Sequence, residues 1–222
     1  MRPANTSWPM VTASEPSLTL VSDRRRLPGG DLPALAAAAA AAGVDWIQIR
    51  EKDLPDGALI RLARAVMEAV AHTHTRVLVN GRPDVAKLAG AHGVQLPEAG
   101  LPVAEVKRCF PGLTLGASRH SLDGARRAEA DGADFVLLGP VFATPGKTQP
   151  PLGLGALAEA ARSLRVPVHA IGGVSAETAG AARGAGARGL AAIRPFLERD
   201  VAKAVRALRA AAAAGEARPP SA

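Results

Sequence analysis

The sequence predicts a single α/β domain, a parallel (β/α)8 barrel, over residues 17–214. Eight short β-branched or leucine-rich runs alternate with eight segments of helical pattern, and this regular alternation requires a parallel sheet. Eight units without a long insertion fit a closed TIM barrel, which commonly forms one domain of about 200 to 250 residues. An open doubly wound sheet is the alternative, but no GxGxxG motif follows the first strand.

The expected elements follow one another in strand–helix order. The strands are expected at residues 18–23, 46–51, 76–80, 93–97, 114–118, 135–140, 167–172 and 189–194. The helices are expected at about 31–42, 55–72, 83–90, 102–109, 121–131, 153–164, 175–185 and 199–214. Pro83 suits the first turn of its helix, and Ser121 and Ser175 suit N-cap positions.

The two ends of the chain and its composition predict which segments are disordered and where the protein is located. Residues 1–16 lack the apolar segment of a secretory signal, so we expect a disordered leader there and a disordered tail at 215–222. No apolar run reaches the roughly 18 residues of a membrane span, which predicts a soluble, cytoplasmic protein. Cys109 is the single cysteine, and we expect it to be a small buried side chain.

The charge balance and the low aromatic content leave anionic small molecules open as ligands and argue against nucleic acid. Lys and Arg outnumber Asp and Glu by 27 to 20, yet only 3% of residues are aromatic and no basic stripe carries stacking residues. We therefore expect no nucleic-acid partner. The run Arg24–Arg26 is expected to be a solvated loop.

Polar residues at the end of the second strand indicate a binding site. In a barrel of this kind the active site forms at the carboxyl ends of the strands. Alternation in WIQIREK points Gln48, Arg50 and Lys52 one way, and points Ile47 and Ile49 towards the helices. Two cations at the rim favour a phosphate or carboxylate ligand. The alternative is an internal ion pair with a carboxylate of a neighbouring strand.

Two loops near the strand ends also suit an anion. Gly172 and Gly173 end the seventh strand, where backbone N–H groups can approach a phosphate, although a double glycine also serves any tight turn. The loop at residues 143–153 carries Lys147 and suits either a lid or a plain connection.

The fifth strand supplies a candidate acid/base. Thr114, Gly116, Ser118 and His120 share one face, and an imidazole titrates close to neutral pH. A histidine after a strand is otherwise a surface loop residue. Asn80, ending the third strand, either reads the edge of a heterocycle or forms an ordinary turn.

Together these segments resemble a known family. LVSD, QIREK, VNGRPDVA, GVQLP, GASRHS, GPVFATPGK and AIGGV resemble, in order, the thiamine phosphate synthase and TenI superfamily over residues 18–197. The resemblance implies a (β/α)8 barrel that acts in thiamine biosynthesis on a small phosphorylated thiazole.

The resemblance implies one of two activities. Synthases of this superfamily join a pyrimidine diphosphate to a thiazole phosphate with Mg²⁺, held by aspartates at positions matched here by Gly81 and Gly100. Glycine offers no oxygen ligand, and Glu98 and Asp84 are out of register. The NGR, VQLP and SxHS segments are more similar to the TenI branch, thiazole tautomerases, in which the residue matched by His120 moves the proton.

We therefore expect a thiazole tautomerase without a metal or redox cofactor. The alternatives are a thiamine phosphate synthase, which would use Mg²⁺, and a non-catalytic binding barrel of the same pathway. The sequence leaves open whether the protein forms a homodimer. The resemblance implies roles for three groups of residues: Arg50, Lys52 and Lys147 at the anionic groups, Gln48, Asn80 and Ser118 along the pocket, and Gly172, Gly173, Ile193 and Arg194 at the phosphate. Arg194 stands where the superfamily often has Ser.

Overall fold

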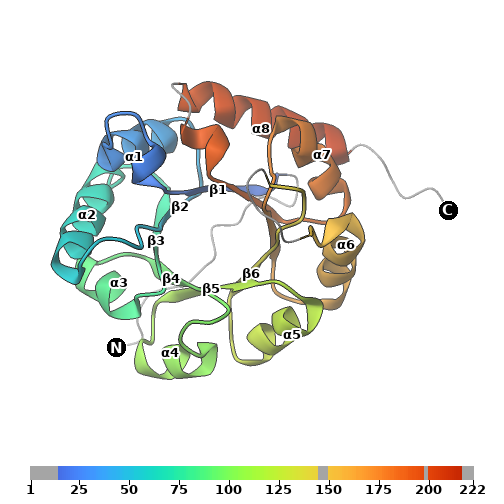
Figure 1. Cartoon of the computed structure of the whole chain (residues 1–222), viewed down its shortest axis with the longest axis horizontal. Coiled ribbons are helices and arrows are strands. Elements are labelled where there is room, and N and C mark those ends of the chain that lie inside the picture. Colours follow the sequence, from blue (N-terminus) through green and yellow to red (C-terminus); the bar gives the residue numbers. More distant parts are fainter. Residues whose placement is uncertain (1–14, 145–149, 198–199, 217–222) are drawn as a thin grey trace.

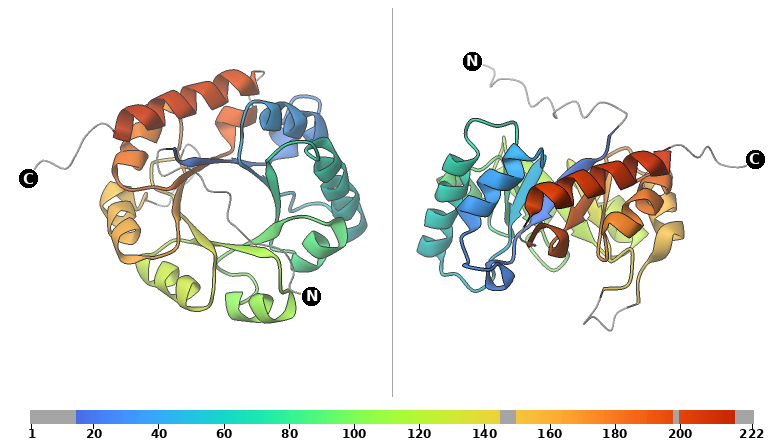
Figure 2. Two further views of the ribbon diagram at one scale, coloured as in Figure 1. Left: turned by 180° about the vertical axis from the view of Figure 1, so that it is seen from behind. Right: turned by 90° about the horizontal axis from the view of Figure 1, so that it is seen from above.

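A computed structural model describes residues 15–144, 150–197 and 200–216. Eight parallel strands close into a barrel in chain order, and β8 pairs with β1 to complete the ring. Helices surround the barrel on all sides, as seen along its axis in Figure 1 and from two further directions in Figure 2. The predicted single (β/α)8 TIM barrel is therefore confirmed.

The strands and helices alternate along the described chain. The strands are β1 (Ser17–Val21), β2 (Trp46–Ile49), β3 (Arg76–Asn80), β4 (Gly93–Leu96), β5 (Thr114–Arg119), β6 (Phe135–Leu138), β7 (Val168–Ile171) and β8 (Gly189–Ala192). The helices are α1 (Leu32–Ala41), α2 (Asp56–Ala69), α3 (Pro83–Ala89), α4 (Val103–Cys109), α5 (Leu122–Ala130), α6 (Gly153–Ser163), α7 (Ala176–Gly184) and α8 (Val201–Glu216). Two 3-10 turns, η1 (Arg24–Arg26) and η2 (Arg194–Leu197), complete the set.

Several boundaries differ from the predicted ones. The second strand stops at Ile49 rather than residue 51, because its pairing with β3 ends there and the chain turns into the rim loop. The last helix runs to Glu216, two residues past the predicted domain end. Cys109 is exposed rather than buried, since it occupies the last turn of α4. None of the helices in the described ranges is long and apolar enough to cross a membrane.

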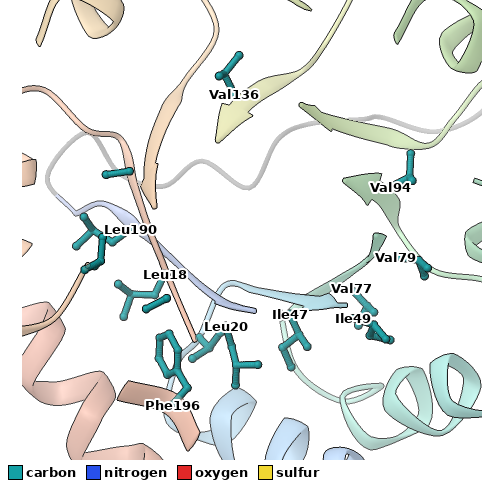
Figure 3. Close-up of a cluster of buried hydrophobic side chains, with 14 of the residues drawn as sticks. Leu18, Leu20, Ile47, Ile49, Val77, Val79, Val94, Val136, Leu190 and Phe196 are labelled. Carbon is teal, nitrogen blue, oxygen red and sulfur yellow. The ribbon is translucent and has the colours of Figure 1, made fainter. Parts of the chain in front are cut away.

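Side chains alternate between two cores, as the pattern of WIQI predicts. Ile47 and Ile49 are fully buried between the strands and the helices, whereas Trp46 points into the barrel. Figure 3 shows the outer layer, where Leu20 of β1 lies near Phe196 of η2. Burial of these apolar faces is the main force that closes the ring.

The barrel interior holds three rings in contact, of which Trp46 and Phe135 are tilted and Phe135 and His169 are stacked. Trp46 and Phe135 lie 5.9 Å apart between ring centroids, and Phe135 stacks on His169 at 4.9 Å. Glycines make room for these rings: a Cβ on Gly116 would lie 2.3 Å from Phe135, and one on Gly189 would lie 2.4 Å from His169. Complete burial lowers the pKa of His169 to about 3, so the imidazole is neutral and belongs to the packing.

Candidate functional site

A cavity of about 520 Å³ opens at the carboxyl ends of the strands. Its size suits a small-molecule ligand. The structure brings these predicted residues together along its wall: Gln48, Arg50, Lys52, Asn80, Ser118, His120, Gly172, Gly173, Ile193 and Arg194. Lys147 lies outside the described residues. The positions agree with the predicted site, while the role of each residue stays a prediction.

The cavity floor is polar and built by four successive strands. Gln48 donates from Nε2 to Oδ1 of Asn80 over 3.0 Å, and Gln95 donates from Nε2 to Oγ of Ser118 over 2.9 Å. The Oε1 atoms of Gln48 and Gln95 are buried without a hydrogen-bond partner among the described residues. Such acceptors favour a ligand or water that donates. Sequence analysis missed Gln95, although alternation in GVQL places its side chain inside the barrel.

Among the described residues, four cations from three parts of the chain line the cavity: Arg26, Arg50, Lys52 and Arg194. Arg26 is exposed, in agreement with the expected solvated segment, and from η1 it also lines the cavity. Its neighbour Arg24 instead donates to Asp53 over 2.6 Å. A run of charged residues has no periodicity, so the sequence could not predict which of these arginines lines the cavity and which pairs with a carboxylate.

Glu51 holds the backbone that presents Arg50 and Lys52. Its buried carboxylate accepts from Ser22 Oγ at 2.5 Å and from the Arg24 N–H at 3.1 Å. Ser22 Oγ in turn accepts from the Arg50 N–H at 2.9 Å. A buried carboxylate with several donors fixes the local backbone. Glu51 was missed as a site residue, although it alternates with the two cations in REK.

The Gly172-Gly173 turn packs closely against the loop after β6. Both glycines have positive φ, +90° and +66°. A Cβ on Gly172 would lie 2.5 Å from Pro140, and one on Gly173 would lie 2.6 Å from the carbonyl oxygen of Ala143. Only glycine fits this turn, which continues past Val174 into α7. Backbone at the start of a helix favours anions, so this wall suits a phosphate.

His120 is held in one orientation at the rim. Its Nδ1 donates to the carbonyl oxygen of Gly139, the residue after β6. A carbonyl oxygen only accepts, so Nδ1 carries the hydrogen and Nε2 of the neutral ring holds the lone pair. Nε2 lies 3.9 Å from Oε2 of Glu98. The arrangement therefore offers a base to a ligand in the cavity.

The residues around the expected metal positions do not fit Mg²⁺. Gly81 and Gly100 provide no side-chain oxygen, and octahedral Mg²⁺ normally uses one or two carboxylates. Asp84 lies close in sequence, but Arg82 donates to both of its oxygens, at 2.9 and 2.6 Å. Within the described residues no group of three His, Cys, Asp or Glu side chains could hold a metal.

The fold and the cavity define an enzyme-type (β/α)8 barrel with a cation-lined cavity at its strand ends. The family described as thiamine monophosphate synthase matches residues 18–196. The chain therefore belongs to the thiamine monophosphate synthase and TenI family, a family of thiamine biosynthesis.

Individual relatives agree with this family. The chain is 44% identical over 193 residues to a thiamine-phosphate synthase of Anaeromyxobacter dehalogenans, covering 85% of this chain and 86% of the relative. It is 44% identical over 187 residues to that of Methanoculleus marisnigri, covering 82% and 89%. The solved thiamine phosphate pyrophosphorylase from Pyrococcus furiosus has 31% identity and a TM-score of 0.82, covering 90% of this chain and 96% of that one.

These comparisons bear differently on the two predicted activities. They confirm the superfamily that the motifs indicated. The names of the relatives support the synthase alternative and lend no support to the tautomerase that the sequence analysis put first.

Proposed function

We propose that this chain acts on a phosphorylated thiazole carboxylate and aromatises the ring by proton transfer, as a thiazole tautomerase. His120 takes the ring proton on Nε2 and returns a proton to the exocyclic carbon, so the reaction is an isomerisation with no net loss of atoms. Aromaticity of the product drives the step. Arg50 and Lys52 balance the negative charge that develops in between.

The donor set of the cavity supports this choice. The cavity wall presents an oriented imidazole, His120. Positions 81 and 100 are glycines, and Asp84 is already bound by Arg82. Displacing a diphosphate needs strong charge compensation at the leaving group, which carboxylate-held Mg²⁺ provides in phosphoryl chemistry. Moving a proton between carbons needs a positioned base and no metal. We therefore propose that the reaction uses neither metal nor redox cofactor.

The phosphate of the substrate is proposed to lie at the opposite wall of the cavity. Gly172, Gly173 and Ile193 offer backbone there, and Arg194 adds a cation. The floor acceptor Gln48 Oε1 would take a hydrogen bond from the ligand or from a water that bridges to it.

A second candidate is a thiamine phosphate synthase. The observation that favours it is the name carried by relatives 44% identical to this chain. In that case pyrimidine diphosphate and thiazole phosphate would share the cavity, and Mg²⁺ would need ligands other than side chains at positions 81 and 100.

One pair of assays separates the candidates. The purified protein is given the non-aromatic thiazole carboxylate phosphate in D₂O, and separately the pyrimidine diphosphate with thiazole phosphate and Mg²⁺. The proposal expects an aromatic product with deuterium on the exocyclic carbon, and no thiamine phosphate. Thiamine phosphate without tautomerisation would establish the second candidate. Binding without turnover in either assay would instead indicate a non-catalytic barrel.

A further inference from the structure

Glu98 is a charged residue of the cavity that the proposed reaction does not yet use. It lies in the loop between β4 and α4 and lines the cavity beside His120. Its Oε2 is 3.9 Å from Nε2 of His120, and the two side chains are 36% and 49% exposed. Glu98 therefore faces the ring nitrogen that the proposed reaction protonates.

Nδ1 of His120 cannot replace Nε2 as the base. Nδ1 of His120 donates to the carbonyl of Gly139, which holds the ring plane and the tautomer. When Nε2 takes a proton the ring becomes a cation. The carboxylate of Glu98 is the anion placed to stabilise that cation.

The carboxylate of Glu98 lies against the first turn of α5. Gly124 lies in this turn, and a Cβ there would come within 2.8 Å of Oε1 of Glu98 and 3.1 Å of Oγ of Ser121. Ser121 caps the helix by accepting from the Gly124 N–H at 3.1 Å. A carboxylate is favoured at a helix N-terminus, and the missing side chain of Gly124 leaves room for it.

Other charges around the pair come from β5 and from the segment that follows β2. Arg119 of β5 is half-buried: burial lowers its pKa, and the nearby charge of Glu98 opposes that lowering. Arg50 and Lys52, which follow β2, line the same cavity. These cations disfavour a charged imidazole, so an anion next to His120 is needed to stabilise the protonated ring.

We propose that Glu98 is a positioning residue that stabilises the protonated form of His120 during proton transfer. This inference rests on the proposed tautomerase function. Nε2 takes a proton from the ring carbon, exchanges it with solvent and gives a proton to the exocyclic carbon, while Glu98 stays a carboxylate throughout. Because both side chains are partly exposed, solvent weakens the interaction and its effect is modest.

The first test compares Glu98→Gln with Glu105→Gln, which removes a carboxylate from the exposed face of α4. Without the anion the protonated ring of His120 is less stabilised, so the ascending limb of the kcat/KM profile against pH in Glu98→Gln is expected to move towards lower pH. A weaker base also lowers kcat, by about threefold. Glu105→Gln is expected to leave both unchanged. Identical profiles for the two variants would overturn the proposal.

A second variant keeps both charged side chains. Gly124→Ala pushes Glu98 away from His120 and is expected to move the same limb in the same direction. Alanine is the better helix former, so poor folding would not account for this result. An unchanged profile in Gly124→Ala together with an unchanged profile in Glu98→Gln would show that the contact has no part in the reaction.

A third measurement does not depend on turnover. Long-range ¹H–¹⁵N spectra of the His120 ring, recorded against pH without substrate, give the pH at which the ring changes from the neutral to the charged signature. We expect this pH to be lower in Glu98→Gln than in wild type or Glu105→Gln. Absence of tautomerase activity would refute the proposed function alone, whereas an unchanged ring titration would refute the role of Glu98.

Discussion

Arg82 binds Asp84 through two parallel hydrogen bonds, Nε to Oδ1 at 2.9 Å and Nη2 to Oδ2 at 2.6 Å. The same guanidinium also donates to Asp56. These bonds hold the pKa of the Asp84 carboxyl below its usual value, so the group stays ionised but is already paired. The carboxylate of Asp84, the closest in sequence to Gly81, is thus already paired with Arg82, and this pairing opposes metal binding.

This pairing leads to a prediction about Mg²⁺. Restoring oxygen ligands with the double substitution Gly81→Asp and Gly100→Asp is expected to create Mg²⁺ affinity in the presence of inorganic diphosphate, measured by calorimetry. Gly81 has φ of +69°, which Asp tolerates better than most residues, and an added Cβ would meet only Pro97 at 3.6 Å. Gly90→Asp, at φ +72° in open space, is the matched control. Equal Mg²⁺ binding by wild type would contradict the prediction.

Loss of the His120 imidazole is expected to stop the reaction without preventing ligand binding. His120→Gln removes the base, so kcat is expected to fall by a factor of about 10² to 10⁴. Affinity for thiazole phosphate, measured by calorimetry, is expected to change less than about threefold, because the phosphate is proposed to lie at another wall. His72→Gln, at an exposed position, serves as the control. A His120→Gln variant with wild-type kcat would refute the assignment of the base.

The glycine turn after β7 is expected to be sensitive to a single methyl group. Gly173→Ala combines a φ of +66° with contacts of 2.6 and 2.7 Å to the loop after β6, so the turn must shift. Gly153→Ala has a similar φ of +79° but nothing within 4 Å, which isolates the effect of crowding. We expect Gly173→Ala to weaken phosphate binding about tenfold, and Gly153→Ala to leave it unchanged. Equal phosphate affinities in the two variants would contradict this role of the turn.

Arg50 is expected to contribute to affinity in either candidate reaction. Arg50→Met keeps the aliphatic stem and removes the charge, so Kd for the phosphorylated ligand is expected to rise about tenfold or more. Arg25→Met removes an equal charge from an exposed position of η1. Titrations at low and high salt then separate a direct contact from the general field of the protein. If both variants bind alike, Arg50 has no direct contact with the ligand.

The buried His169 is expected to make stability fall in acid. Its pKa is about 3 in the folded protein against 6.5 for an ordinary histidine, so between these values only the unfolded chain binds the proton. Stability is fully present above about pH 6.5 and falls as pH drops, by at most about 1.4 kcal/mol per pH unit from this residue.

Urea unfolding at a series of pH values measures this slope. His169→Gln is expected to be less stable near neutral pH but to lose less stability on acidification than wild type. His72→Gln is expected to follow the wild-type slope. Comparing slopes cancels the acid-sensitive ion pairs, such as Arg82 with Asp84, that all three proteins share.

The sequence by itself determined the barrel and many of the residues on its cavity wall. Period and alternation are local properties, so they place Gln48, Arg50 and Lys52 on one face and Ile47 on the other without knowledge of any partner. The rule that parallel strands end at one rim then brings Asn80 and His120 to the same cavity.

Only the tertiary structure decided which neighbours these residues have. Arg24 and Arg26 are two positions apart, yet one pairs with Asp53 and the other lines the cavity. Glu98 meets His120 only because β4 and β5 pair in one register and α5 begins with Ser121 and a glycine that leaves space. Such contacts depend on register, closure of the ring and the exact course of its loops, which no local pattern encodes.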